Sequence, residues 1–107
     1  MPPNDPTYKT AQGKLQLQID DPVAQGIYSN FQVVGSNETE FVIDYAYIPP
    51  GAQKGKVRSR IILSPKHAKA LAGILGQRIR DFENRYGTIP PPASFLSGSK
   101  SGSGLPN

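Results

Sequence analysis

Hydrophobic and polar residues alternate along the first half of the chain, and a period of two predicts β-strands. At the start of this region Leu15, Leu17 and Ile19 alternate with polar residues. The later segments are rich in β-branched and aromatic residues, and turn residues separate them. The predicted strands are 14–20, 27–34, 41–48 and 56–63. Because the connections are short and consecutive, we predict an antiparallel four-stranded β-meander.

After the fourth strand the apolar period changes to 3.6 residues, which predicts one long α-helix over 65–86. Ser64 suits the N-cap, Pro65 suits the first helical position, and Gly87 suits the end of the helix. The apolar stripe consists of Ala68, Leu71, Ala72, Leu75, Ile79, Phe82 and Tyr86. A helix of this length spans roughly 33 Å, which exceeds what a small sheet can cover.

These elements predict an α+β domain at 14–87, flanked by a disordered arm at 1–13 and a disordered tail at 88–107. The two ends are proline-rich or Gly/Ser-rich and cannot bury enough apolar surface to offset chain entropy. A folded part of this size has a marginal core on its own. We therefore expect a homo-oligomer, most simply a twofold dimer. Its expected contacts come from Leu75, Ile79, Phe82 and Tyr86 of the helix.

Positive charge is concentrated in one segment. Nine of the 12 basic residues lie within 54–85, and this segment has a formal charge of +7. In a regular strand Lys56, Arg58 and Arg60 would share one face, with Val57 and Ile61 on the other. These three cations, which we call the ladder, would suit a polyanion, because neutralising phosphates releases counterions. The ladder also suits an acidic protein partner, or a solvated face that discourages edge-to-edge aggregation.

A polyanion site would need more than the ladder. Tyr28 is a candidate for stacking on a base, so the expected ligand is single-stranded DNA or RNA, or else another polyanion. The helix carries Gly73 and Gly76 away from its apolar stripe, where glycine permits close approach of another molecule. Lys69 and Arg80 lie on that side and are added to the candidate ligand-binding residues.

Candidate catalytic chemistry is sparse, and we expect a protein that is not an enzyme. The absence of cysteine excludes thiol catalysis and disulfides. His67, the one histidine, has no acidic residue at ligand spacing, so no metal or cofactor is expected. Asp44 is expected to pair with an arginine across the strands. The segment 51–56 resembles a phosphate-binding loop, but it has the wrong spacing and leads into a strand.

The remaining features concern partners and location. Residues 90–96 combine three prolines with Phe95 and Leu96, which is typical of a short docking motif or of a linker end. No apolar run is long enough to cross a membrane, and the start lacks the pattern of a signal peptide, so a cytoplasmic location is expected. The alternative to nucleic-acid binding is a protein–protein adaptor or scaffold subunit.

Four motifs occur in order: IDDPVAQGIYSN at 19–30, EFVID at 40–44, KVRSRIILSPKHAK at 56–69 and YGTI at 86–89. With them the chain resembles, over about residues 15–89, the small bacterial proteins known as domain of unknown function 3467. The resemblance implies a small, soluble bacterial protein. It implies no activity and no catalytic residues, because the family has none assigned, and it does not distinguish between the two classes of partner.

Overall fold

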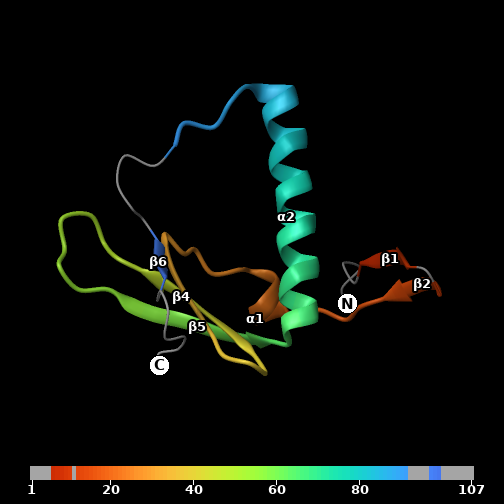
Figure 1. Ribbon diagram of the computed structural model, residues 1–107, viewed down its shortest axis with the longest axis horizontal. Coiled ribbons are helices and arrows are strands. Elements are labelled where there is room, and N and C mark those ends of the chain that lie inside the picture. The colour runs from red at the N-terminus through yellow and green to blue at the C-terminus, as the bar shows by residue number, and fades with distance from the viewer. Residues whose placement is uncertain (1–5, 11, 92–96, 100–107) are drawn as a thin grey trace.

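The computed structural model describes residues 6–10, 12–91 and 97–99, the last three by their backbone alone. Its main sheet has the strand order β5-β4-β3-β6 (Figure 1). The strands β3 (Phe31–Ser36), β4 (Phe41–Tyr47) and β5 (Lys56–Leu63) are antiparallel neighbours. The short strand β6 (Ser97–Ser99) pairs with β3 in parallel. The predicted α+β class is confirmed, and three of the predicted meander strands lie next to one another as expected.

The predicted first strand does not join this sheet, so the four-stranded meander is wrong in that respect. Of the predicted strand 14–20, only residues 14–16 are in a strand, β2 (Gly13–Gln16), which pairs with β1 (Thr7–Thr10) in a separate antiparallel hairpin. The helix α1 (Asp21–Ala24) then separates the hairpin from β3. Alternation predicts that a segment is a strand, but it does not choose the strand's partner.

The strand β3 also begins four positions later than predicted. The residues just before it are joined to the neighbouring chain segment mainly by side-chain hydrogen bonds. The Ser29 hydroxyl donates to the carbonyl oxygen of Ala46 at 2.9 Å. The Asn30 amide donates to the Ile48 carbonyl at 2.9 Å and accepts from the Ile48 backbone N–H at 2.9 Å. These bonds fasten residues 28–30 to the end of β4 without a regular strand pairing.

Structure also occurs in both ends of the chain, where disorder was predicted. Strand β1 lies in the predicted arm, and β6 lies in the predicted tail. The remaining parts of these predictions, at residues 1–5, 11, 92–96 and 100–107, lie outside the described residues. So does most of the predicted docking motif, including Phe95 and Leu96.

The long helix α2 (Pro65–Tyr86) has the predicted bounds. Its start is capped by Ser64, whose hydroxyl oxygen accepts from the backbone N–H of His67 at 3.2 Å. At its end Gly87 has φ 103°, and its N–H donates to the Glu83 carbonyl at 2.9 Å. A positive φ is readily adopted only by glycine, which explains why the helix ends there.

The helix rises from one face of the sheet instead of lying along it (Figure 1). Cross-strand partners share a face, and the register places the following residues on the face toward α2: Val34, Phe41, Ile43, Tyr45, Ser59, Ile61 and Leu63. The opposite face carries Val33, Val42, Asp44, Ala46, Arg60 and Ile62. Both faces are therefore partly apolar.

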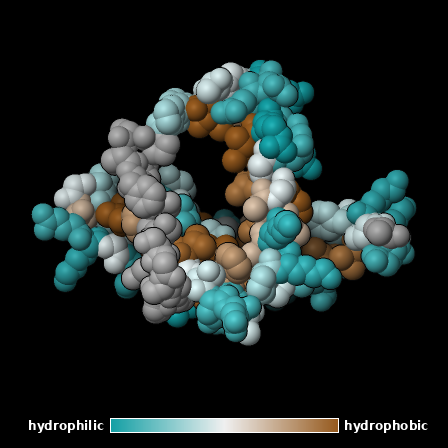
Figure 2. All heavy atoms as spheres, in the orientation of Figure 1, coloured by the Kyte–Doolittle hydropathy of each residue, from teal (hydrophilic) through white to brown (hydrophobic). Residues whose placement is uncertain are grey.

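The described chain has almost no buried apolar core. No residue of α2 is buried, and among the described hydrophobic residues only Ala46, 7% exposed, is buried. Figure 2 shows apolar side chains gathered around an open hollow between the helix and the sheet. Large apolar side chains of the helix and of the sheet, such as Ile74, Leu75 and Ile62, are more than half exposed. A single copy thus leaves exposed the apolar surface that a folded domain normally covers.

Candidate functional site

A β-bulge in β5 decides where the basic residues point. Tyr45 lies opposite Ser59, whereas the next residue, Ala46, lies opposite Val57. Arg58 is therefore an extra residue with no partner of its own on β4. One extra residue reverses the alternation on one side of the bulge relative to the other.

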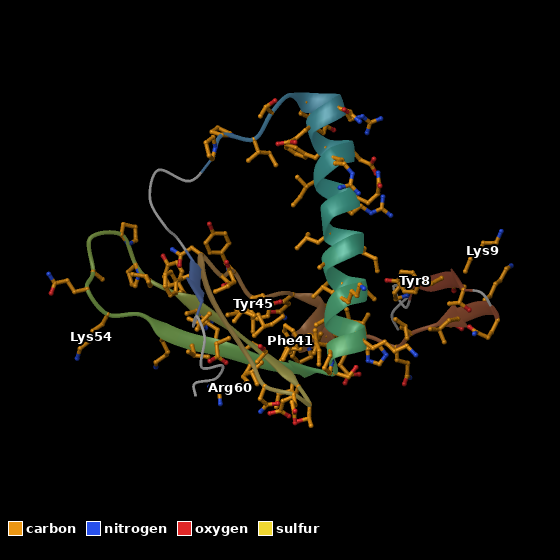
Figure 3. All side chains as sticks on the ribbon, in the orientation of Figure 1. Tyr8, Lys9, Phe41, Tyr45, Lys54 and Arg60 are labelled. Carbon is orange, nitrogen blue, oxygen red and sulfur yellow. The ribbon has the colours of Figure 1, made fainter. Side chains whose placement is uncertain are left out.

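The bulge splits the predicted ladder, and the prediction that three cations share one face is wrong. Lys56 lies opposite Tyr47, on the face toward α2. Lys56 and Arg58 both line a surface depression that is described below. Arg60 lies opposite Asp44 on the other face (Figure 3). Val57 likewise lies on the face opposite to Ile61, although both were predicted to point inward together. The prediction failed because it assumed a regular strand.

Two of the ladder residues nevertheless belong to a common site, which we call the basic pocket. This open depression has a volume of about 520 Å³ at the end of the β4–β5 hairpin. It is lined by Tyr47, Pro49, Lys54, Gly55, Lys56 and Arg58. All three cations are exposed, and within the described part of the chain none of them takes part in an ion pair. The pocket therefore presents uncompensated positive charge to solvent.

Gly55 allows the loop to lie close to β4 at this pocket. A Cβ atom at this position would come within 2.9 Å of the Tyr47 carbonyl oxygen. A larger residue would push the loop, and with it Lys54, away from Tyr47. The glycine thus helps to hold the cationic loop beside an aromatic ring.

Tyr47, which lines the basic pocket, forms a pair with Tyr28. The ring of Tyr28 meets the ring of Tyr47 edge to face, with centroids 6.1 Å apart and an interplanar angle of 71°. Tyr28 is 73% exposed, so its ring is available to a ligand. The hydrogen bonds of Ser29 and Asn30 to β4 fix the backbone next to it. Tyr28 thus contacts Tyr47, which lines the basic pocket together with Lys56 and Arg58.

Arg60 has a different environment. Its Nε donates to Asp44 Oδ1 at 2.7 Å and its Nη2 donates to Oδ2 at 2.9 Å. The predicted cross-strand pair of Asp44 with an arginine is thereby confirmed. The hydrogen bond from Arg60 lowers the pKa of Asp44 below its usual value, and the carboxylate in turn raises the pKa of Arg60. Arg60 is thus engaged by Asp44, whereas Lys56 has no ion-pair partner among the described residues.

This pair predicts how stability depends on pH. Because the pKa of Asp44 is lower in the folded state, the ionised carboxylate stabilises the fold above about pH 4, and this contribution is lost as pH falls below it. We expect Asp44→Asn to lower the urea midpoint at pH 7 and to reduce the further decrease between pH 4 and pH 2. The control is Glu38→Gln in the exposed β3–β4 turn. An acid-induced decrease of the same size in Asp44→Asn would contradict the assignment.

The two helix cations that were candidates for the site are not brought to it. Lys69 borders the apolar cleft at the base of α2. Arg80 lies farther along the helix, where its Nη2 donates to Gln77 Oε1 at 3.0 Å. Of the two helix glycines, Gly73 has open space around it and Gly76 lies beside Arg80 Nη1. A role for Lys69 and Arg80 in ligand binding therefore stays a prediction, separate from the basic pocket.

A second feature of the surface is an apolar cleft between α2, α1 and the sheet. One part, about 370 Å³, is lined by the base of α2 and by β-strand residues that include Phe41 and Ile43. The adjoining part, about 630 Å³, is lined by the α1 region together with Tyr45 and Ile61. Figure 3 shows Phe41 and Tyr45 on the side of the sheet that faces the helix. We call both parts together the apolar cleft.

Beyond this cleft the apolar stripe of α2 continues without a partner among the residues that the structure describes. The predicted oligomer contacts Leu75, Ile79, Phe82 and Tyr86 are all exposed. Phe82 and Tyr86 pack on each other, with ring centroids 4.9 Å apart. Both rings remain accessible from the side that the sheet does not reach. The predicted overhang of the helix is therefore present.

The structure gives two further observations on chemistry. Among residues 6–10, 12–91 and 97–99, no group of three or more His, Asp or Glu side chains is placed to hold a metal ion. No helix in the same part of the chain is long and apolar enough to cross a membrane.

Comparison with known proteins gives one match. No curated protein and no solved structure matches the chain. A family model described as "Protein of unknown function (DUF3467)" matches residues 2–90. The match includes the hairpin, the three antiparallel strands of the main sheet and both helices, and it ends before β6. Because the model covers most of the 107 residues, the chain belongs to this family.

Proposed function

We propose that the protein is a non-enzymatic, homo-oligomeric binding module whose basic pocket binds single-stranded nucleic acid. The observation that carries the proposal is the placement of three unpaired cations, Lys54, Lys56 and Arg58, beside the Tyr28–Tyr47 pair. Cations attract phosphates, and exposed rings stack on unpaired bases whatever their sequence. The combination suits a polynucleotide better than it suits a small anion.

The aromatic pair favours a single strand over a duplex. The bases of a duplex are stacked on each other and offer only their edges in the grooves. Tyr28 is mostly exposed, which suits a base that is free to unstack. A duplex would contact the cations alone and gain nothing from the tyrosines.

The non-enzymatic part of the proposal is supported by the chemistry around the basic pocket. Its lining contains no carboxylate, no histidine and no hydroxyl nucleophile apart from the Tyr47 phenol. A general base beside a nucleophile is the usual requirement for hydrolytic catalysis. Binding without turnover is what this set of side chains supports.

The homo-oligomeric part is supported by the surface that one copy leaves uncovered. In proteins most of a helix's stability comes from packing of its apolar face, yet none of the 22 residues of α2 is buried. Leu75, Ile79, Phe82 and Tyr86 on one side of this helix are all exposed, so a partner can bury them. A second copy offers the same apolar surface and so can cover it symmetrically.

A protein–protein adaptor is the second candidate function. The apolar cleft favours it, since an amphipathic segment of another protein would bury the same side chains. In that case the cations around the basic pocket would contact an acidic partner or only solvent.

Binding of a fluorescent oligothymidylate, followed by anisotropy at increasing salt, tests the proposed function. We expect log K to fall linearly with log salt, with a slope of about −0.7 for each phosphate neutralised on a single strand. A duplex of the same length should bind more weakly. Absence of salt-dependent binding, together with purified protein free of absorbance near 260 nm, would favour the adaptor.

Replacing Tyr28 tests the stacking part. We expect Tyr28→Ala to weaken oligothymidylate binding by roughly 1–3 kcal/mol, about 5- to 150-fold, because one base loses its platform. Tyr28→Phe is the matched control, since it keeps the ring and should bind nearly as well as the parent. If alanine and phenylalanine behaved alike, the ring would not be a stacking surface.

A further inference from the structure

The N-terminal hairpin is amphipathic and uncovered. We call β1, β2 and the following Leu17 the arm; the backbone N–H of Leu17 continues the pairing by donating to the Pro6 carbonyl at 2.9 Å. Tyr8 pairs with Leu15, so both side chains and that of Leu17 lie on one face. The other face carries Thr7, Lys9, Lys14 and Gln16. Every residue of both strands is exposed, including the apolar ones.

Such a hairpin is not stable by itself. Two strands without a third element to pack on are marginal in water at best. Here Lys9 also lies directly opposite Lys14, and like charges at opposed positions destabilise a pair. A hairpin with one polar and one apolar face therefore requires a surface that covers Tyr8, Leu15 and Leu17.

Within the described residues, the arm's own chain does not supply that surface. The arm and the main sheet lie on opposite sides of α2 (Figure 1). Only residues 18–20 connect the arm to α1, which begins at Asp21. The apolar cleft of the same chain lies between α2 and the sheet, on the side of α2 away from the arm. The arm thus projects away from its own cleft.

A second copy supplies a suitable surface. Each copy has one uncovered apolar arm and one uncovered apolar cleft. Strands of four residues span about 13 Å, so the arm is short enough to lie beside the helix of roughly 33 Å. If each arm occupies the other copy's cleft, the assembly closes on itself, with no arm left over.

We propose that the arm of one copy packs its Tyr8–Leu15 face into the apolar cleft of a second copy, reciprocally about a twofold axis. This inference rests on the homo-oligomeric part of the proposed function and names the segment that completes the interface. The family match begins at residue 2 and so includes the arm. In this arrangement the polar face with Lys9 and Lys14 remains in water.

Single-cysteine chains test the proposal, because the protein has no cysteine of its own. We would prepare Leu15→Cys and Leu75→Cys separately, unfold and refold them together, and treat the mixture with a short bismaleimide. Leu75 lines the cleft, so we expect a covalent dimer whose digest contains the 15–75 pair. Lys14→Cys, on the polar face of the arm, is the matched control and should give at least fivefold less product with Leu75→Cys.

The other outcomes separate this inference from the proposed function. A Leu15→Cys/Leu75→Cys double variant that cross-links only within one chain would overturn the exchange and place the arm on its own cleft. Absence of the 15–75 product from a protein that is dimeric by light scattering would refute the arm contact and leave the oligomer standing. A monomer by light scattering would refute both.

Discussion

Replacing Phe82 with aspartate should convert the oligomer into monomers or unfold it. Phe82 is 48% exposed in a single copy and lies in the overhanging part of the α2 stripe, against Tyr86. In the assembly that we propose, this ring becomes buried, and an unpaired carboxylate in its place costs several kcal/mol. A cost of about 3 kcal/mol corresponds to a more than 100-fold weaker association. Light scattering across a micromolar concentration series measures the mass, and circular dichroism on the same samples reports folding.

Asn84→Asp is the matched control for this change. Asn84 is exposed and lies near Phe82 in sequence, on the opposite side of the helix from the apolar stripe. The same new charge should leave both mass and stability nearly unchanged there, because surface substitutions usually act within ~0.5 kcal/mol. A parent protein that is monomeric at micromolar concentration and still unfolds cooperatively would count against the oligomer. So would a Phe82→Asp variant with the parent's mass.

Sequence patterns predicted the elements of this fold better than their partners. The bounds of α2 follow from local signals, which are the Ser64 cap, Pro65 and Gly87. The strands β4 and β5 likewise lie within one residue of the predicted ranges. What failed is the assignment of the first strand, which pairs with β1 and not with the main sheet. Pairing depends on long-range packing, which alternation in one segment cannot reveal.

The candidate site shows a similar division. The sequence predicted Lys56, Arg58 and Arg60 on one sheet face with Tyr28 beside them. In the structure Lys56 and Arg58 line the basic pocket, Tyr28 contacts Tyr47, and Arg60 lies on the other face. The sequence did not single out Lys54 as a site residue. A signal was available, since Gly51 and Gly55 mark a hairpin loop that brings the end of β4 against the start of β5.

Arg60 was assigned wrongly because the bulge at Arg58 has no clear signature in the sequence. The strand KVRSRIIL contains no glycine or proline to mark an irregular position. Asp44 nevertheless carried information, because an acidic residue within an apolar strand requires a partner on a neighbouring strand. Once Arg60 is assigned to Asp44, the remaining cations of the strand are Lys56 and Arg58. The corrected site adds Lys54 from the loop.

Neutralising this corrected set should have the largest effect on nucleic-acid binding. In the triple variant Lys54→Gln, Lys56→Gln and Arg58→Gln, each subunit loses up to three phosphate contacts. The slope of log K against log salt should therefore flatten by up to about 2 units per subunit that contacts the strand. At low salt the affinity should fall about equally for every sequence, because phosphate contacts carry no base information.

A second triple variant separates the pocket from the net charge of the protein. Lys66→Gln, Arg78→Gln and Arg85→Gln, all on α2, remove the same formal charge from exposed positions outside the basic pocket. This variant should keep most of the affinity, because screening at 0.1 M salt acts over about 10 Å and direct contacts determine the slope. Arg60→Gln should also bind like the parent, since Arg60 is engaged by Asp44 on the other face of the sheet. If the pocket variant bound oligothymidylate as tightly as the helix variant at equal salt, the pocket cations would be solvated surface charges and the adaptor function would be favoured.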